Sequence, residues 1–381
     1  MISIQNKEQC CGCGACEQTC PQRSIVMEQD SEGFLYPRVN KETCINCEKC
    51  LHICPQLNIQ NTDDHIIGCY AGYAQDTLLR YNSSSGGIFG VIAKLVLEKK
   101  GVVYGSAFEK DFSVHHIRID NISDLPLLQG SKYVHSIMGN TYKQVKNDLD
   151  LGIEVLFSGT ACQIAGLRHF IGKDYKNLLT IDILCHGVPS PMIWQLYVQK
   201  VSRAYKSKIV DVNFRSKEIG WKQFALKISF DKKSTYFASH NRDIFMKTFL
   251  ENVCLRPSCY ACIYKNLNRH SDITIGDAWG INKLLPTMDD NKGTSIIITH
   301  TDTGEQYIHD IATMMVIKKI DVDTILPKSS DSRKSVEKSP YREIFFKMAN
   351  IKGYKVFRWW LKFMRKQKFL QKVKRVFIKH I

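Results

Sequence analysis

The chain has 381 residues, 44% hydrophobic and 24% charged, so it is long enough for two or three domains and is not intrinsically disordered. The formal net charge is +16, and +11 of it comes from residues 351–381, which contain eleven Lys and Arg residues and no acidic residue. The other 350 residues carry only +5, which argues against a general nucleic-acid-binding surface. No signal-peptide pattern or long apolar run is present, so we expect a cytoplasmic protein whose fifteen cysteines bind metal rather than form disulfides.

The first 60 residues hold nine cysteines but little apolar periodicity, so this domain is expected to need bound metal to fold. Two groups of four cysteines, each followed by proline, match C-x2-C-x2-C-x3-C-P, a pattern in which the fourth cysteine of each group reaches the other cluster. The sequence therefore predicts a 2[4Fe-4S] ferredoxin-type domain over 1–60. The expected ligands are Cys10, Cys13, Cys16 and Cys54 for one cluster, and Cys44, Cys47, Cys50 and Cys20 for the other.

A zinc module is the alternative, because paired C-x2-C units also bind zinc. Zinc requires neither the additional C-x2-C step nor the proline after the fourth cysteine in both copies, so the pattern favours iron–sulfur clusters. Cys11 is interpreted as a bystander thiol. The polar stretch 55–67 is expected to be a linker.

Residues 68–326 alternate β-rich runs with segments of helical apolar spacing, which predicts an α+β domain with an α/β-like mixed sheet. The pattern does not give the strand order. The expected strands are 101–108, 154–159, 178–185, 208–214, 224–230, 272–278 and 294–301. The expected helices are 87–99, 160–171, 191–206, 243–252 and 304–315.

Four cysteines of this domain suggest a further metal site. Cys162 follows an expected strand, Cys185 ends another, and Cys259-x2-Cys262 is a chelating step. We therefore expect them to bind a third [4Fe-4S] cluster at one edge of the sheet. In the alternative, Cys162 and Cys185 are small buried apolar residues and the pair binds nothing.

The C-terminal residues 327–381 are expected to form a linker and a tail. The linker, 327–340, is rich in Ser and Lys and contains two prolines. Residues 341–381 interleave aromatic and aliphatic side chains with basic ones, which predicts a basic amphipathic helix. Such a helix either lies on an anionic membrane surface, making the protein peripheral at the inner face of the membrane, or packs on the body or a partner.

Six phrases of the second domain resemble, in order, the coenzyme F420 hydrogenase/dehydrogenase β-subunit family. They are SSSGGIFG (83–90), GSKYVHS (130–136), FSGTACQIAGL (157–167), IDILCHGVPSP (181–191), LRPSCYACIY (255–264) and SDITIGDAWGI (271–281). The resemblance implies a flavin, usually FAD, and an additional four-iron cluster in the same domain. Ala161 departs from the family, which usually has proline there, and this loosens a turn beside Cys162.

The phosphates of such a flavin have a candidate site at the start of a helix. Ser84, Ser85, Gly86 and Gly87 open an apolar helix, where hydroxyls and unhindered backbone N–H groups suit a diphosphate. An ordinary N-cap and turn is the alternative. Lys132 is a candidate to supply positive charge to the phosphates or the flavin ring, and a solvated lysine is its alternative.

Further candidate flavin contacts lie in one strand. Asp272, Gly276, Asp277 and Trp279 are expected together at the end of that strand, where a carboxylate can accept ribityl or ribose hydroxyls. A β-turn is the alternative. His186 is interpreted as a hydrogen-bonding neighbour of the third cluster rather than a proton donor, and no catalytic residue is assigned.

The resemblance implies an oxidoreductase that exchanges a hydride at a flavin for single electrons in [4Fe-4S] clusters. The expected partners are a ferredoxin-like electron carrier or a partner redox subunit, and a small-molecule substrate that is F420-like, organic or sugar-linked. A non-catalytic electron-transfer subunit without flavin is the alternative. An iron–sulfur sensor with a nucleic-acid-binding tail is the least favoured, and no nucleic-acid partner is expected.

Overall fold

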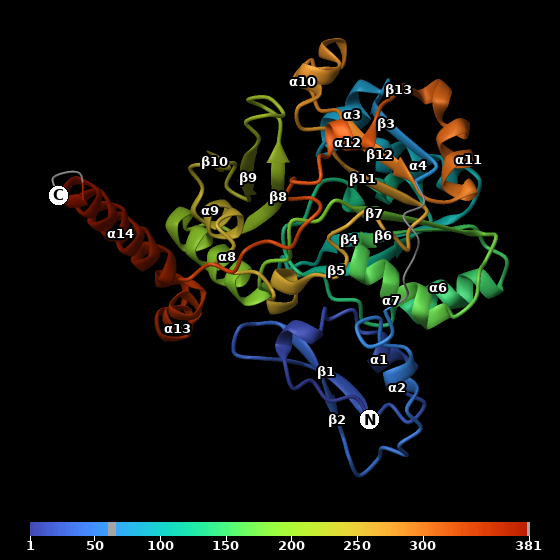
Figure 1. Cartoon of the computed structure of the whole chain (residues 1–381), viewed down its shortest axis with the longest axis horizontal. Coiled ribbons are helices and arrows are strands. Elements are labelled where there is room, and N and C mark those ends of the chain that lie inside the picture. Colours follow the sequence, from blue (N-terminus) through green and yellow to red (C-terminus); the bar gives the residue numbers. More distant parts are fainter. Residues whose placement is uncertain (60–65, 379–381) are drawn as a thin grey trace.

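The computed structural model describes residues 1–59 and 66–378, so part of the expected linker 55–67 lies outside the described residues. The N-terminal module, residues 1–59, is coloured blue in Figure 1 and lies against one side of the larger body. Its β1 (Ile25–Gln29) and β2 (Leu35–Val39) form an antiparallel hairpin. The helical segments are η1 (Lys7–Gln9), α1 (Ala15–Thr19) and α2 (Lys49–His52).

The body is built on an eight-stranded sheet of order β13-β3-β12-β11-β7-β6-β4-β5. Neighbours from β4 to β11 are parallel, while β5, β12, β3 and β13 join antiparallel, so the expected mixed sheet is confirmed. The strands are β3 (Gly68–Ala74), β4 (Val102–Phe108), β5 (Val114–Ile119), β6 (Val155–Thr160), β7 (Leu178–Ile183), β11 (Ile273–Asp277), β12 (Ser295–Thr299) and β13 (Met315–Lys319).

Helices cover both faces of this sheet because successive strand residues point to opposite sides. Val103 and Leu156 pack with α4 on one face, whereas Tyr104 and Phe157 pack with α6 and α7 on the other. The result is a three-layer α/β/α arrangement. Its helices are α3 (Thr77–Asn82), α4 (Ile88–Glu98), α5 (Leu125–Leu128), α6 (Thr141–Asp150), α7 (Ala161–Ile171), α10 (Ile281–Leu284), α11 (Asp302–Asp310) and α12 (Val322–Ile325).

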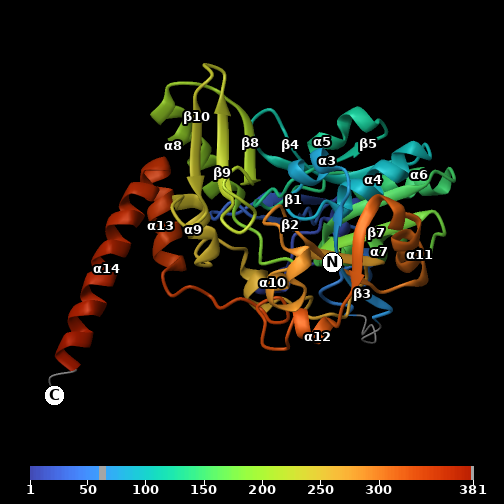
Figure 2. The ribbon, with the colours of Figure 1, turned by 90° about the horizontal axis from the view of Figure 1, so that it is seen from above.

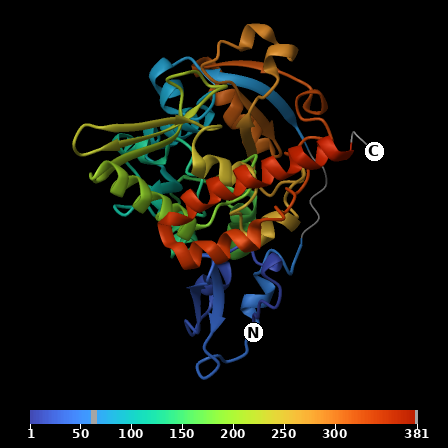
Figure 3. The same ribbon diagram turned by 90° about the vertical axis from the view of Figure 1, so that its left-hand side faces the viewer.

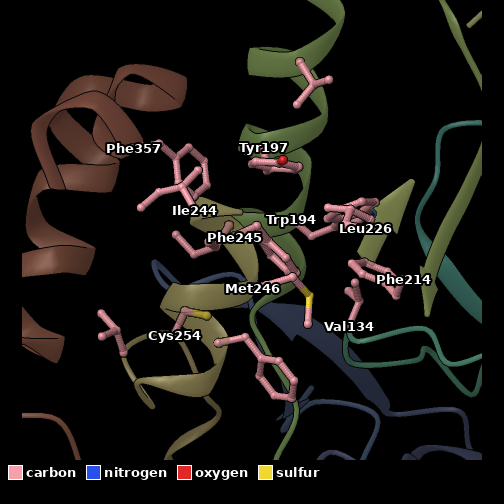
Figure 4. Close-up of a cluster of buried hydrophobic side chains, with 14 of the residues drawn as sticks. Val134, Trp194, Tyr197, Phe214, Leu226, Ile244, Phe245, Met246, Cys254 and Phe357 are labelled. Atoms are coloured by element: carbon pink, nitrogen blue, oxygen red, sulfur yellow. The ribbon is translucent and has the colours of Figure 1, made fainter. Parts of the chain in front are cut away.

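A second, antiparallel sheet of order β10-β9-β8 has its own core. Figure 2 shows it standing beside the large sheet. Its strands are β8 (Ile209–Ser216), β9 (Ala225–Phe230) and β10 (Thr235–Ser239), packed with α8 (Pro191–Tyr205) and α9 (Ile244–Leu250). Fully buried aromatic side chains, among them Trp194, Phe214 and Phe245, fill this core (Figure 4). All seven expected strands are therefore present, divided between two sheets.

The segment 327–340, expected to be a linker, packs on the body. Val336 is buried in the core of the smaller sheet, and Ser335 Oγ donates a hydrogen bond to the backbone oxygen of Cys262 at 3.2 Å. Lys265 Nζ donates to the backbone oxygen of Asp331 at 2.8 Å. The segment therefore covers the chain around Cys262 instead of spanning two separate bodies.

The tail forms two helices, α13 (Arg342–Lys352) and α14 (Val356–Ile378), on the side of the molecule that faces the viewer in Figure 3, and Figure 2 shows α14 extending away from the body toward its C-terminal end. Phe357 and Trp360 are buried in the same core as α8 and α9, so these two side chains are not available to a membrane surface. The first turns of α14 therefore pack on the body. The side chains of 368–381 lie outside the described residues. No helix in the described part of the chain has the length and apolar character needed to span a bilayer.

Replacing Trp360 with alanine is expected to destabilise the fold, because the side chain is 1% exposed. We expect a loss of about 3–5 kcal/mol in the free energy of unfolding, measured by urea denaturation with circular dichroism. Leu361→Ala is the control, since Leu361 is 39% exposed and should change stability by less than about 0.5 kcal/mol. Equal effects of the two substitutions would contradict the docking of α14.

Candidate iron–sulfur and cofactor site

A cavity in the N-terminal module is lined by five cysteines: Cys11 and the four motif cysteines Cys10, Cys13, Cys16 and Cys54. Its empty volume is about 340 Å³, open solvent included. Cys16 lies in α1, and Cys54 follows α2 at the far end of the second motif. These four residues, called the inner set below, are the ones that the motif spacing groups together.

A second cavity, of about 370 Å³ on the same measure, is lined by the other four motif cysteines: Cys20, Cys44, Cys47 and Cys50. We call these the outer set. Backbone N–H groups of Ser24 and Ile2 donate to the sulfur atoms of Cys20 and Cys50, both at 3.3 Å. Hydrogen bonds to the ligand sulfur atoms are one of the features by which proteins tune iron–sulfur clusters.

The two cysteine loops have the same backbone conformation. Gly12 and Gly14 have φ of 72° and 74°, and Asn46 and Glu48 at the equivalent positions have φ of 52° and 58°. Asn and Glu hold a left-handed conformation that costs energy without glycine. The module is therefore a structural repeat whose loop shape is kept in both copies.

The structure also brings together the four body cysteines, called the body set below. Cys162 lies in the first turn of α7, Cys185 follows β7, and Cys259 and Cys262 lie in and just after η3 (Pro257–Ala261). Burial, followed by the neighbouring thiols of Cys162 and Cys262, raises the pKa of Cys185 to about 12. Burial and then the Cys162 thiol raise the pKa of Cys262 to about 11.

No three or more His, Cys, Asp or Glu side chains in the described ranges converge on the position of a single metal ion. Near the body set, His186 Nε2 lies 2.7 Å from Asn252 Oδ1, so this ring nitrogen has a hydrogen-bond partner outside the set. The turn before Cys162 is held by a capping box between Thr160 and Gln163, although Ala161 replaces the family's usual proline.

The inner and body sets are adjacent. Cys11, interpreted from sequence as a bystander, is buried beside the thiols of Cys13 and Cys162, which act on its pKa. Tyr264 packs with Cys162 through its ring and donates from its hydroxyl to the backbone oxygen of Pro55 at 3.1 Å. Cys11 and Tyr264 thus join the two sets through direct contacts.

Several contacts fasten the module to the body. Arg342 makes a bidentate ion pair with Glu32 and donates to the backbone oxygen of Leu255. The module also packs closely against α7, where a Cβ on Gly166 would lie 3.1 Å from Cys13 Sγ. The absence of a side chain at Gly166 therefore permits the approach of the inner set.

The expected phosphate loop lies beside β12. Ser84 Oγ accepts from the backbone N–H of Ser131 at 2.7 Å, and Ser85 Oγ donates to the backbone oxygen of Thr294 at 2.9 Å. Gly86 has no room for a Cβ, which would lie 2.3 Å from the backbone oxygen of Gly72. The two hydroxyls have internal partners, as in an ordinary turn.

Gly87 and Lys132 also make local contacts. Gly87 is the N-cap of α4 with φ of 94°. Lys132 Nζ donates to the backbone oxygens of Leu127 and Gln129, both at 2.8 Å, and burial lowers its pKa to about 7. The ammonium therefore caps the carbonyl groups at the end of α5.

The expected cluster of residues on β11 is divided between the two ends of that strand. Asp272 lies before β11, where it accepts from Arg168 and from the backbone N–H of Thr180. Asp277 ends the strand, roughly 16 Å away at about 3.3 Å per residue. The expectation that Asp272 lies with Asp277 is wrong, and Asp272 serves the opposite edge of the sheet.

Asp277 and two cysteines of the body set share the carboxyl edge of the sheet. Thr160, Ile183 and Ile275 are register partners on the parallel strands β6, β7 and β11. Two residues farther along these strands come Cys162, Cys185 and Asp277. Gly276 belongs to the same edge, since its missing side chain leaves room for Leu184.

Two basic residues that the sequence patterns do not single out complete this edge. Arg215, buried at the end of β8, makes a bidentate ion pair with Asp277 and donates to the backbone oxygen of Ser84. Lys217 Nζ donates to the backbone oxygens of Arg80, Ser85 and Lys292. The sequence signal that could have indicated them is the position of Arg215 and Lys217 just after the expected strand 208–214.

Two tryptophans lie beside this ion pair. The rings of Trp221 and Trp279 stack with centroids 4.5 Å apart, and Trp221 Nε1 donates to Asp277 at 2.8 Å. Trp221 is buried whereas Trp279 is 48% exposed. The carboxyl edge therefore combines buried cations with an exposed aromatic face.

Gly166→Val is expected to loosen the attachment of the module, because its side chain would overlap Cys13 and Tyr142. Overpacking of this kind costs about 1–3 kcal/mol. We expect a lower unfolding midpoint and faster proteolytic release of the module. Asn147→Val, at an exposed position of α6, should change neither, and indistinguishable variants would contradict the role of Gly166.

Comparisons with known proteins identify both parts of the chain. A family model that describes the C terminus of the coenzyme F420 hydrogenase/dehydrogenase beta subunit matches residues 153–324, which include the body set. A 4Fe-4S dicluster domain model matches residues 9–58, which include the inner and outer sets.

Curated proteins include no match to this chain. A chain of the F420-reducing [NiFe] hydrogenase complex from Methanosarcina barkeri, solved as a xenon derivative, is similar over 78% of this chain and 93% of its own length, with 15% identity and a TM-score of 0.46. The two family models together show that residues 153–324 form a C-terminal domain of the coenzyme F420 hydrogenase/dehydrogenase beta-subunit family and that residues 9–58 form a 4Fe-4S dicluster domain.

Proposed function

We propose that the protein is a flavin-dependent iron–sulfur oxidoreductase subunit that exchanges a hydride for single electrons. The observation that carries this proposal is the adjacency of three cysteine sets, the last of which shares the carboxyl edge of the sheet with Asp277 and Trp279. Open α/β sheets bind ligands at this edge. Single electrons would enter and leave at the outer set, and the hydride would be exchanged at the carboxyl edge of the sheet.

Each cysteine set would hold one [4Fe-4S] cluster. The ligands would be Cys20, Cys44, Cys47 and Cys50 in the outer set; Cys10, Cys13, Cys16 and Cys54 in the inner set; and Cys162, Cys185, Cys259 and Cys262 in the body set. Each set supplies four thiolates, the usual ligands of a [4Fe-4S] cluster, and backbone N–H groups donate to Cys20, Cys50 and Cys259.

A flavin would bind at the carboxyl edge, near Ser84, Arg215, Asp277 and Trp279. The buried Nε of Arg215 has no hydrogen-bond partner within the described residues, and the buried Lys217 adds a second cation, so the edge suits an anionic group. The exposed face of Trp279 suits an aromatic ring. Once bound, the flavin would supply hydride chemistry, and the clusters would supply one-electron transfer.

A ferredoxin-like carrier or partner redox subunit would dock at the outer set. Cys47 is exposed there, and Ile45 beside it is 59% exposed. Apolar exposure around a redox centre suits a transient contact with another protein. The small-molecule substrate would be F420-like, organic or sugar-linked.

Iron, zinc and flavin quantitation on one anaerobically purified sample tests the proposal. Three four-iron clusters require about twelve iron atoms per chain, together with one flavin and no zinc. About eight iron atoms without flavin would instead support the non-catalytic electron-transfer subunit.

Cys185→Ala is expected to remove about four iron atoms per chain, because a cubane loses one of its four thiolate ligands. The matched control is Cys69→Ala, which removes a buried thiol of β3 outside the three sets. Its iron content should equal that of the wild type. An unchanged iron content in Cys185→Ala would exclude Cys185 as a ligand.

Trp279→Ala is expected to weaken flavin binding by roughly 3- to 10-fold, since an aromatic contact is worth about 0.5–1.5 kcal/mol beyond its buried area. FAD titration followed by flavin fluorescence measures this effect. Leu78→Ala, which shortens a side chain that is 67% exposed on α3, should bind FAD as the wild type does. Equal affinity in all three proteins would count against the flavin site.

A further inference from the structure

Arg256 is a fully buried arginine where the N-terminal module meets the body. Its Nε donates to the backbone oxygen of Cys10 at 2.8 Å, and its Nη2 donates to that of Leu35 at the same distance. Nη2 also lies 3.6 Å from Cys10 Sγ. The guanidinium group therefore touches a proposed ligand of the inner set directly.

No carboxylate among the described residues forms an ion pair with Arg256. Its Nη1 is buried and without a hydrogen-bond partner in the same part of the chain. A Cβ on Gly12 would lie 2.7 Å from this nitrogen, so Nη1 points at the cysteine loop that lines the inner cavity. A buried cation with an unsatisfied donor is costly unless a negative group lies nearby.

Aromatic rings offset only part of this cost. The guanidinium carbon lies 4.4 Å from the ring centroid of Tyr36 and 5.4 Å from that of Phe34. Cation–π contacts are worth about 2 kcal/mol when desolvated, less than the several kcal/mol that burial of an ion costs. A full negative charge is still required, and the nearest candidate is the inner set.

Arg342 provides the contrast. It is also a buried arginine that joins the module to the body, but it has the Glu32 carboxylate as its counter-charge. The two arginines thus have the same docking role, and only Arg256 lacks an acidic partner among the described residues and contacts a cysteine sulfur. A comparison of the two arginines therefore separates the effect of charge at the inner set from the effect of docking.

We propose that Arg256 is the counter-charge of the inner set and raises the reduction potential of the cluster held there. The inference rests on the proposed function. Reduction adds one electron, with no bond made or broken, and a cation in a low-dielectric site stabilises the more negative state. Arg256 is a positioning residue. Its charge would stabilise the electron on the inner cluster, which lies between the body set and the outer set.

Redox titration of the anaerobic full-length protein, followed by electron paramagnetic resonance, tests this role. Arg256→Met is expected to keep its iron and to lower the midpoint of one cluster by a tenfold change in the reduction equilibrium, or about 59 mV for one electron. Arg256→Lys retains the charge, and its midpoint should stay within about a threefold change of the wild type.

Arg342→Met is the matched control, and it should lose stability without moving any midpoint. Unchanged midpoints in an iron-replete Arg256→Met protein, or equal shifts in both methionine variants, would overturn the inference. If Arg256→Met loses iron, Arg256→Lys becomes the deciding variant. A midpoint potential near that of the wild type would support the role of charge, and a tenfold change in the reduction equilibrium would refute it. Absence of iron from the wild type would instead refute the proposed function.

Discussion

The whole structure depends on bringing cysteine thiols from distant parts of the chain into groups of four. The inner set joins the first motif to Cys54, the last cysteine of the second motif, and the body set joins the ends of two parallel strands to a short segment that begins near Pro257. Thiols packed this closely repel one another once they ionise. The fold therefore has to supply hydrogen-bond donors and positive charge around them.

Positive charge is placed unevenly around these groups. Arg256 contacts the inner set, whereas Arg215 and Lys217 gather at the carboxyl edge near Asp277. Buried cations are expensive, so their positions indicate where negative groups are to be held. By this argument the inner set and the carboxyl edge are two of the places prepared for negative charge.

The local parts of this architecture could be predicted from sequence, and the long-range parts could not. Motif spacing fixes which thiols share a loop, and strand and helix periodicity located all seven expected strands. Arg256 carries no local signal, and the position of Arg215 after an expected strand does not reveal its partner, because the two arginines contact Cys10 and Asp277, which lie 246 and 62 positions away. The packing of 327–340 was missed for the same reason, since its polar composition resembles that of a solvated linker.

The fixed docking of the module separates two kinds of electron transfer. Arg342, Arg256 and the close approach at Gly166 hold the inner set against Cys11 and Cys162, so the spacing of the inner and body sets is set by folding. Transfer between them would be intramolecular and independent of protein concentration. The outer set has an exposed cysteine, so exchange with a carrier would be a bimolecular step that depends on encounter. In the proposed function the module would therefore act as a fixed extension of the body that carries electrons to the surface.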